Sequence, residues 1–202
     1  MPSFSKIVEK VIFTRLIRYI DSNKILSDSQ YGFRQKHSTS MAVADMYDKN
    51  SYALDRSEYS VGIFIDLSKA FDTLDHVILL RKLEHYGIRG AALQWFQSYL
   101  SNRRQYVFVN EISSSLKFVT CGVPQGSILG PLLFILYIND IVCCSDVLKF
   151  ILFADDTNIF YSHLDSGKLE EIVNGELVKL AQWIIANKLS LNAQKTNFMF
   201  LV

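Results

Sequence analysis

Two adjacent acids, Asp155 and Asp156, stand between two short apolar segments, Lys149–Phe153 and Thr157–Tyr161. Both segments have the length and the β-branched or aromatic content of buried strands. Because so few residues separate them, the segments predict a tightly joined pair of strands with two carboxylates at the bend. Adjacent carboxylates repel each other unless a positive charge lies between them. The alternative is that each aspartate only caps a turn, but apolar flanks would fix the bend on a core and leave the acids facing out.

A third acid follows another strand-like run. Val61–Ile65 is nearly continuous in apolar residues, which is typical of a buried strand, and Asp66 comes directly after it. If this strand and the first pair lie in one sheet and end at the same edge, Asp66, Asp155 and Asp156 converge. Oxygen ligands without a nearby histidine favour Mg²⁺ or Mn²⁺ over zinc. Two such ions about 3.5–4 Å apart can activate a hydroxyl and stabilise a leaving phosphate oxygen, so the pattern predicts phosphoryl transfer.

Hydrophobic periodicity predicts helices along the rest of the chain, one of them capped by Ser38. The expected helices cover residues 5–20, 40–54, 75–86, 91–100, a segment from Pro131, and 168–187. Alternating residues in 105–110 and 115–120 predict a hairpin whose turn is the serine run between them. Residues 189–192 are expected to form a strand or a turn. This order of elements predicts an α+β fold with helices packed against an antiparallel sheet.

Composition limits the class of protein. Half of the 202 residues are hydrophobic and 20% are charged, which excludes a disordered or collagen-like chain. The formal charge of +1 argues against a free-standing polyanion binder. Residues 1–120 hold 16 basic and 12 acidic side chains, whereas 121–202 hold 5 and 8. This weak asymmetry suits a site that meets phosphates on one side and cations on the other.

The cysteines and the N-terminal segment bear on location. Cys121, Cys143 and Cys144 show no metal-ligand spacing, so we expect buried, reduced thiols in an intracellular protein, without a choice between nucleus and cytoplasm. The first ten residues carry two lysines and a glutamate, which does not fit a secretory leader. The longest apolar run, 131–138, is too short to cross a bilayer, so no membrane association is expected.

Five segments of the chain combine these acids with glycines and polar residues in a fixed order. They are Tyr31-Gly-Phe-Arg34 through His37-Ser-Thr39, Phe64-Ile-Asp66-Leu-Ser-Lys-Ala-Phe71-Asp72, Gly122-Val-Pro-Gln-Gly-Ser-Ile-Leu-Gly-Pro131, Phe153-Ala-Asp-Asp156, and Leu191-Asn192 through Lys195-Thr196. In this order they resemble the fingers motif and motifs A, B, C and D of reverse transcriptases. The chain is similar in this respect to the non-LTR retrotransposons of the jockey type. The resemblance covers almost the whole chain.

The resemblance implies a right-hand polymerase palm, with a ferredoxin-like antiparallel sheet backed by helices, and part of the fingers. It assigns approximately 1–60 and 87–121 to the fingers, and 61–86 and 122–202 to the palm. The chain stops at Val202, shortly after motif D, so the helical thumb and primer grip of the family are expected to be absent.

The resemblance also implies roles for single residues in metal binding and sugar selection. Asp66 and Asp155 would coordinate both metal ions, Asp156 would support them, and the Leu67 carbonyl would be a further ligand. Phe71 would lie under the incoming sugar and exclude a 2′-hydroxyl; its alternative is a place in the core.

Further roles concern the incoming nucleotide. Gln125 would contact it, and Gly126 would allow close backbone approach, although Gly122 and Gly126 could be turn formers only. Arg34 would hold the triphosphate, where a guanidinium suits phosphate oxygens, or be a solvated loop residue. Lys195 would be a general acid for the leaving pyrophosphate, or a surface lysine.

Two arginines outside these motifs, Arg103 and Arg104, either touch the template backbone or sit in a solvated turn.

The leading hypothesis is therefore an RNA-directed DNA polymerase domain that uses an RNA template, a DNA primer, dNTPs and two Mg²⁺ or Mn²⁺ ions. The alternative is a catalytically inert, truncated retroelement remnant or a weak RNA-binding module, because few phosphate contacts give weak binding at physiological salt. A third hypothesis, a palm-type nucleotidyl cyclase, shares the carboxylate turn but is not supported by Gln125 or the fingers loop.

Overall fold

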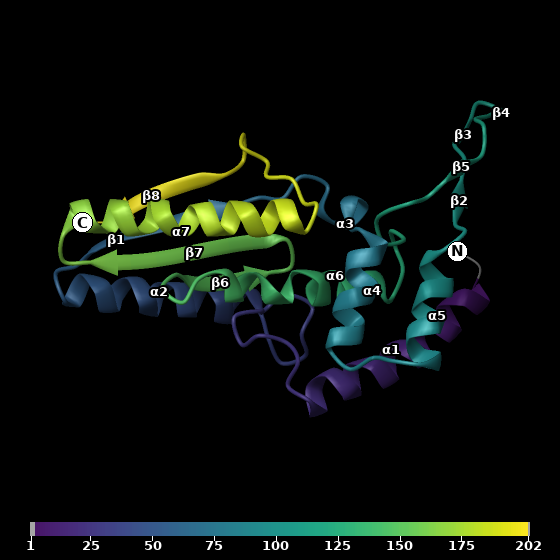
Figure 1. The fold of residues 1–202 in the computed structure, drawn as a ribbon, viewed down its shortest axis with the longest axis horizontal. Helices are drawn as coiled ribbons and strands as arrows, with labels where there is room; N and C mark the ends of the chain where they lie inside the picture. Colours follow the sequence, from purple (N-terminus) through teal and green to yellow (C-terminus); the bar gives the residue numbers. More distant parts are fainter. Residues whose placement is uncertain (1–2, 202) are drawn as a thin grey trace.

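A computed structural model describes residues 3–201 of the chain (Figure 1). The elements are α1 (Ser3–Ser22), α2 (Thr39–Asp55), β1 (Tyr59–Ile65), α3 (Ala70–Thr73), α4 (His76–His85), α5 (Ala91–Leu100), β2 (Arg104–Gln105), β3 (Phe108–Val109), β4 (Ile112–Ser113), β5 (Lys117–Phe118), α6 (Gly130–Ile138), the 3₁₀ helix η1 (Asn139–Cys144), β6 (Lys149–Phe153), β7 (Asp156–His163), α7 (Ser166–Ala186) and β8 (Asn197–Leu201). The predicted α+β class is confirmed. None of the helices in this range is both long enough and apolar enough to span a bilayer.

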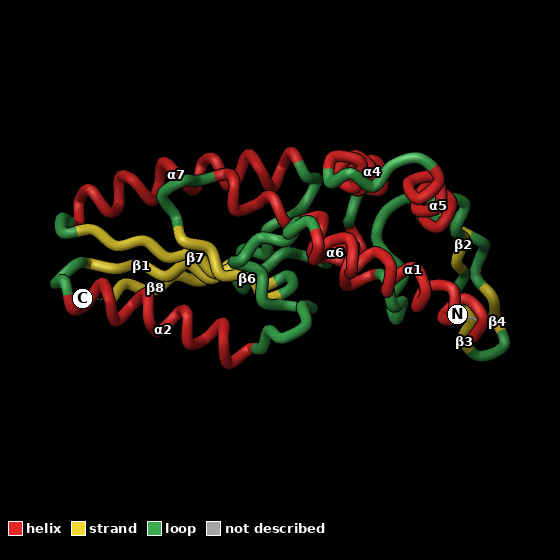
Figure 2. The backbone as a smooth tube through the Cα atoms, turned by 90° about the horizontal axis from the view of Figure 1, so that it is seen from below, coloured by secondary structure: helices red, strands yellow, loops and turns green. Residues whose placement is uncertain are grey.

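Four strands form the main sheet, in the spatial order β6-β7-β1-β8, with every neighbouring pair antiparallel. Along the chain, several helices that include α6 lie between β1 and β6, and α7 lies between β7 and β8. With this strand order, the sheet has the ferredoxin-like arrangement that the sequence analysis expected. The sheet lies between α7 on one face and α2 on the other (Figure 2). The assignment of residue ranges to fingers and palm stays a prediction.

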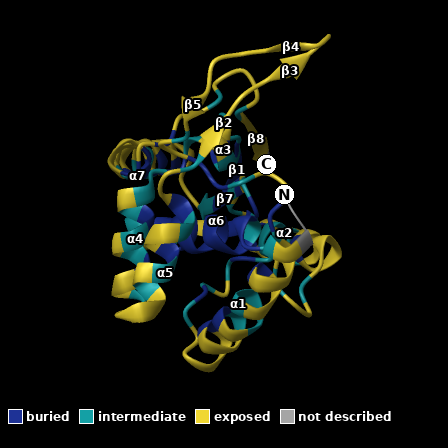
Figure 3. Cartoon of the chain, turned by 90° about the vertical axis from the view of Figure 1, so that its right-hand side faces the viewer, coloured by how far each residue is buried: buried dark blue, intermediate teal, exposed yellow. Residues whose placement is uncertain are grey.

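The centre of the core is α6, which is apolar all round, as expected of a helix without a solvent face. Every residue from Leu132 to Ile138 is buried, and the helix appears as the buried centre of Figure 3. Its one polar side chain, Tyr137, donates its hydroxyl hydrogen to the Asn187 carbonyl oxygen at 2.6 Å. The loop after α7 is thereby tied to the core immediately before it returns to the end of β1.

The helix predictions agree with the structure, including Ser38, whose side chain accepts a hydrogen bond from the Met41 N–H at the start of α2. The predicted hairpin forms, but the predicted position of its turn was wrong. The turn lies at Asn110 and Glu111, which have φ of 48° and 65°, as the tight two-residue turn of a twisted ribbon requires. The serine run, residues 113–115, instead lies in the segment that follows the turn.

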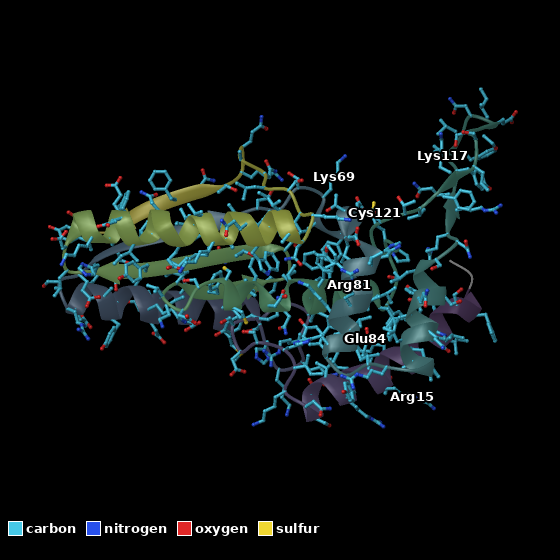
Figure 4. All side chains as sticks on the ribbon, in the orientation of Figure 1. Arg15, Lys69, Arg81, Glu84, Lys117 and Cys121 are labelled. Atoms are coloured by element: carbon cyan, nitrogen blue, oxygen red, sulfur yellow. The ribbon has the colours of Figure 1, made fainter. Side chains whose placement is uncertain are left out.

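The cysteine prediction is only partly right. All three cysteines are free thiols, but Cys121 and Cys143 are exposed rather than buried. Cys144 is half-buried, and burial raises the pKa of its thiol to about 11. Cys121 lies at the foot of the hairpin near α3 (Figure 4), where the chain returning from the hairpin has not yet entered the core.

Candidate active site

The end of β1 and the turn between β6 and β7 lie at one edge of the main sheet. Strand β1 pairs antiparallel with β7, and Ile65 faces Thr157 in that register. Asp66 directly follows β1, and Asp155 and Asp156 directly precede Thr157. Strand pairing therefore brings together acids that are almost ninety positions apart in the sequence.

A cavity of about 530 Å³ opens at this edge. Six residues that the sequence singled out line it together: Asp66, Leu67, Phe71, Gln125, Asp155 and Lys195. Asp156 lies beside it on the same turn and is exposed. Gly126 follows Gln125 with φ of 73°, and a Cβ there would meet no atom within 4 Å. The backbone at Gly126 is thus open to a close approach from outside.

Asp66 is held by the segment that follows α7. The Asn192 side-chain amide donates to Asp66 Oδ2 at 2.7 Å, and the Asn192 backbone N–H donates to the Asp66 carbonyl oxygen at 2.9 Å. The Asp66 N–H in turn donates to Thr196 Oγ1 at 3.4 Å. Asn192 and Thr196 belong to the motif that the sequence analysis quoted, but their contacts with Asp66 were not predicted. These contacts fix the direction in which one carboxylate oxygen faces the cavity.

The turn that carries the other two acids is held from the opposite side by Gln30, which the sequence analysis missed as a site residue. Gln30 is fully buried, and its Oε1 accepts from the Gly32 N–H at 2.8 Å and from the Ala154 N–H at 3.3 Å. Ala154 needs this support because it adopts the left-handed conformation, with φ of 57°. The glutamine that begins the Gln-Tyr-Gly-Phe-Arg segment was the available sequence signal.

The same segment also pairs with the edge strand β6. The Tyr31 N–H donates to the Leu152 carbonyl oxygen, and the Leu152 N–H donates to the Ser29 carbonyl oxygen, both at 2.8 Å. Residues 29–31 therefore act as a short parallel neighbour of β6. The loop before α2 and the acidic turn form one packed unit.

Arg34 does not lie where the sequence analysis expected it. Its Nη1 donates to the carbonyl oxygens of Ser27 and Gln30 at 2.8 and 3.0 Å, and it lines a separate cavity of about 1060 Å³. The guanidinium thus closes its own loop, because it bridges the two carbonyl oxygens at either end of residues 27–30. In this structure Arg34 is not brought to the carboxylate edge.

Phe71 is both a core residue and a wall of the cavity. Its ring stacks on Phe134 with centroids 4.3 Å apart and meets Phe33 edge-on at 6.2 Å. Its carbonyl oxygen accepts from the Val123 N–H at 2.9 Å. The two alternatives that the sequence left open for Phe71 are therefore compatible, since one face is packed while the residue still lines the cavity.

Gln125 and Lys195 both have side chains that can reach into the cavity. The Gln125 amide donates to both carboxylate oxygens of Asp72, at 3.0 and 3.3 Å. Lys195 is exposed, and no salt bridge within residues 3–201 includes it. Lys195 therefore keeps its charge available to whatever enters beside the acids.

The carboxylates at this edge repel one another. Although Asp156 is exposed as a residue, partial desolvation of its carboxyl raises the pKa of this group, the negative charges of Asp155 and Asp66 raise it further, and Lys195 opposes the change. In the described part of the chain, none of the three acids has a salt-bridge partner. The three acids are thus not neutralised by an ion pair, as is typical of a cation site before the cation binds.

The donor set fits Mg²⁺ or Mn²⁺ in its chemistry but is not assembled as a ligand sphere. The edge offers carboxylate oxygens and no histidine, which suits a hard divalent cation. No group of three or more carboxylate, imidazole or thiol side chains among residues 3–201 is spaced to hold a metal ion. A bound cation would have to draw the three acids closer together.

Replacing Asp156 with asparagine is expected to raise the melting temperature at pH 7 in EDTA. A raised pKa means that folding disfavours the charged carboxylate, so the parent loses stability as pH rises above the unfolded pKa of about 4. The gain should vanish below that pH, where the carboxyl is protonated in both states. Thermal melts from about pH 3 to 7 measure it.

Asp165 provides a control of opposite sign for this prediction. The Lys168 N–H that it accepts at the start of α7 lowers the pKa of its carboxyl. Asp165→Asn should therefore lower the melting temperature at pH 7. An Asp156→Asn protein that melts below the parent at pH 7 would contradict the picture of crowded carboxylates.

Comparison with known proteins agrees with the motifs. The family model described as reverse transcriptase (RNA-dependent DNA polymerase) matches residues 1–200. The probable RNA-directed DNA polymerase from transposon BS of Drosophila melanogaster is 34% identical, over 97% of this chain and 22% of that protein. The RNA-directed DNA polymerase from mobile element jockey of the same species is 32% identical, over 96% and 22%. The chain spans about a fifth of the length of these relatives.

Solved structures share the fold at low sequence identity. Apo telomerase from Candida tropicalis superposes with a TM-score of 0.66 and 13% identity, over 95% of this chain and 36% of that one. Telomerase from Candida albicans, in complex with a fragment of telomeric RNA, gives a TM-score of 0.63 and 16% identity, over 95% and 33%. At this identity the likeness concerns the fold alone.

Proposed function

Because the chain belongs to the reverse transcriptase (RNA-dependent DNA polymerase) family, we propose that it is the part of a retrotransposon polymerase that joins a dNTP to a primer 3′-hydroxyl on an RNA template. One observation carries the proposal: the cavity at the edge of the sheet is lined by Asp66 and Asp155 together with Phe71, Gln125 and Lys195. Carboxylates, a cation, an amide and an aromatic wall are the groups that a nucleoside triphosphate and its metal ions need.

In this proposal Asp66 and Asp155, assisted by Asp156, hold Mg²⁺ or Mn²⁺. The ions would make the primer hydroxyl a better nucleophile and neutralise charge on the leaving pyrophosphate. Asn192 keeps the Asp66 carboxylate oriented through its 2.7 Å hydrogen bond. Gln30 does the same for the turn that bears Asp155, through the Ala154 N–H.

The remaining residues contact the substrates. Phe71 limits the space beside the sugar, and Gln125 with the open backbone at Gly126 contacts the incoming nucleotide. Lys195 is the candidate for protonating the leaving pyrophosphate, because it lines the cavity together with Asp66 and Asp155 and forms no salt bridge in the described residues. Arg34 has no role in this proposal.

Primer extension tests the proposal. The full chain, an RNA template with an annealed DNA primer, dNTPs and Mg²⁺ or Mn²⁺ are expected to give extended primer. Asp155→Asn should reduce the rate by two orders of magnitude or more, roughly the cost of removing an electrostatic group that acts on the transition state. Incorporation by the parent no greater than by Asp155→Asn would refute the proposed activity of this chain.

A second candidate function is supported by the spacing of the acids, which do not form a ready ligand group within the described residues. In that case the chain would bind RNA without catalysing primer extension. RNA affinity unchanged by EDTA and by Asp155→Asn, together with no extension under any metal condition, would favour this second function.

A further inference from the structure

Residues 103–119 form a narrow hairpin, here named the arm, which projects from the body of the molecule (Figures 1 and 3). Strand β2 pairs with β5 at its base, and β3 pairs with β4 at its tip. We infer that the arm binds single-stranded RNA and guides a template strand toward the cavity at the sheet edge. This inference rests on the proposed function for the identity of the strand, but not for the binding itself.

The first observation is exposed aromatic surface. Tyr106, Phe108 and Phe118 are 57%, 63% and 62% exposed, and the aliphatic residues between them are exposed as well. The side chains of a two-stranded ribbon of this size bury little against one another, so they are free to contact a partner. Flat rings on an extended ribbon offer platforms on which unpaired bases can stack.

The second observation is charge. The arm holds Arg103, Arg104 and Lys117 against the single acid Glu111, which gives a net charge of +2, whereas the whole chain has +1. No salt bridge in the described structure uses any of the three cations. Lys117 lies on the arm at a distance from the body (Figure 4). The positive charge is therefore concentrated on the arm and free to meet a polyanion.

The two kinds of side chain are interleaved. The Arg104 guanidinium carbon lies 4.7 Å from the centroid of the Phe118 ring, its cross-strand neighbour, and Arg103 lies 5.6 Å from that of Tyr99. Cations beside aromatic rings let one surface bind phosphates and bases at the same time. An apolar protein partner would need the rings but not the cations, and a duplex would need the cations but not the rings. The combination favours a single strand.

The foot of the arm leads into the candidate active site. After Cys121 the returning chain donates from the Gly122 N–H to the Leu74 carbonyl oxygen at 2.7 Å, and from the Val123 N–H to the Phe71 carbonyl oxygen at 2.9 Å. Gln125, which lines the cavity, is two residues further on. A strand that follows the arm toward its foot would thus arrive beside Phe71 and Gln125.

The test measures RNA binding without chemistry. The full chain is titrated, in EDTA and without nucleotides, into a fluorescein-labelled mixed-sequence RNA of about 20 nucleotides, and anisotropy is followed between roughly 50 and 200 mM KCl. One variant removes charge (Arg104→Gln with Lys117→Gln), and another removes rings (Tyr106→Ser with Phe108→Ser). Lys149→Gln with Lys168→Gln is the matched control, since both lysines are exposed and lie outside the arm.

Each variant has its own expected signature. Loss of the two cations should reduce the steepness of the slope of log affinity against log salt concentration by about 1.4, roughly 0.7 for each lost phosphate contact. Loss of the two rings should weaken binding roughly tenfold or more at every salt concentration, with the slope kept, and should weaken binding to a duplex of the same length much less. Melting temperatures should not change, because all four side chains are exposed.

Binding by both arm variants that equals that of the control pair would overturn the inference. An aromatic variant that binds RNA normally but loses self-association would overturn it in favour of a protein interface. The outcome is separable from the proposed function: Asp155→Asn should keep full RNA affinity while it loses primer extension. Arm variants that lose RNA affinity would support RNA binding by the arm even if the parent extends no primer.

Discussion

Replacing Gly32 with alanine is expected to lower the free energy of unfolding by about 3 kcal/mol, at the upper end of the range for overpacking a tight site. A Cβ on Gly32 would lie 2.2 Å from the Ala154 nitrogen and 2.9 Å from the Phe153 carbonyl carbon. Both are backbone atoms, so no side chain can rotate away to make room. Chemical unfolding in urea measures the loss.

The same substitution is expected to reduce primer extension to the level of Asp155→Asn. Gln30 Oε1 accepts from the N–H groups of both Gly32 and Ala154, so separating the two segments breaks the contact that supports the acidic turn. Extension should be assayed at a temperature at which the variant remains folded by circular dichroism. The loss then reports displacement of the turn and not unfolding.

Gly175 offers a matched control for Gly32→Ala. It lies on an exposed turn of α7, and a Cβ there would meet no atom within 4 Å. Gly175→Ala should therefore stabilise the helix by up to about 1 kcal/mol and leave extension unchanged. A Gly32→Ala protein with parental stability and parental extension would show that the loop before α2 does not support the turn.

The main sheet was largely predictable because three of its strands are buried. β1, β6 and β7 are short apolar runs with turn signals or acids at their ends, and their burial makes the pattern plain. β8 was not predicted, since it pairs only with β1 and exposes Phe198, Met199 and Phe200. The side chains from Asn197 to Phe200 are exposed, and a short apolar run such as 198–201 does not by itself distinguish a strand from another element.

From local pattern alone, the candidate site was predictable only where it depends on strand ends, whereas Phe71, Gln125 and Lys195 were expected from the motif resemblance and line the same cavity. Asp66 and Asp155 each follow a recognisable strand, so their meeting at one edge follows from a single sheet. The contacts that orient them do not follow from local pattern. Gln30 reaches Ala154 across 124 positions, and Asn192 reaches Asp66 across 126. Such pairs depend on loop packing, which also explains why Arg34 satisfies nearby carbonyls where a phosphate contact was expected.

Replacing Phe71 with valine is expected to raise incorporation of rNTPs relative to dNTPs by at least roughly tenfold, in a chain that extends primers. The Phe71 ring is fixed from behind by Phe134, at a centroid distance of 4.3 Å and an interplanar angle of 24°. Its backbone is fixed by the Val123 N–H. A ring held in this way cannot move aside for a 2′-hydroxyl, whereas a valine leaves the space open. The ratio of kcat/KM for the two nucleotide types measures the change.

A control must separate this steric effect from lost stability, because Phe71→Val also removes a packed ring at a cost of about 1–3 kcal/mol. Phe96 is buried in α5 and does not line the cavity, so Phe96→Val should cost at least as much stability and leave the nucleotide ratio unchanged. Equal ratios in Phe71→Val and the parent would leave Phe71 with its core role alone. A shifted ratio in Phe96→Val would mean that loosened packing, and not the missing ring, relaxes sugar selection.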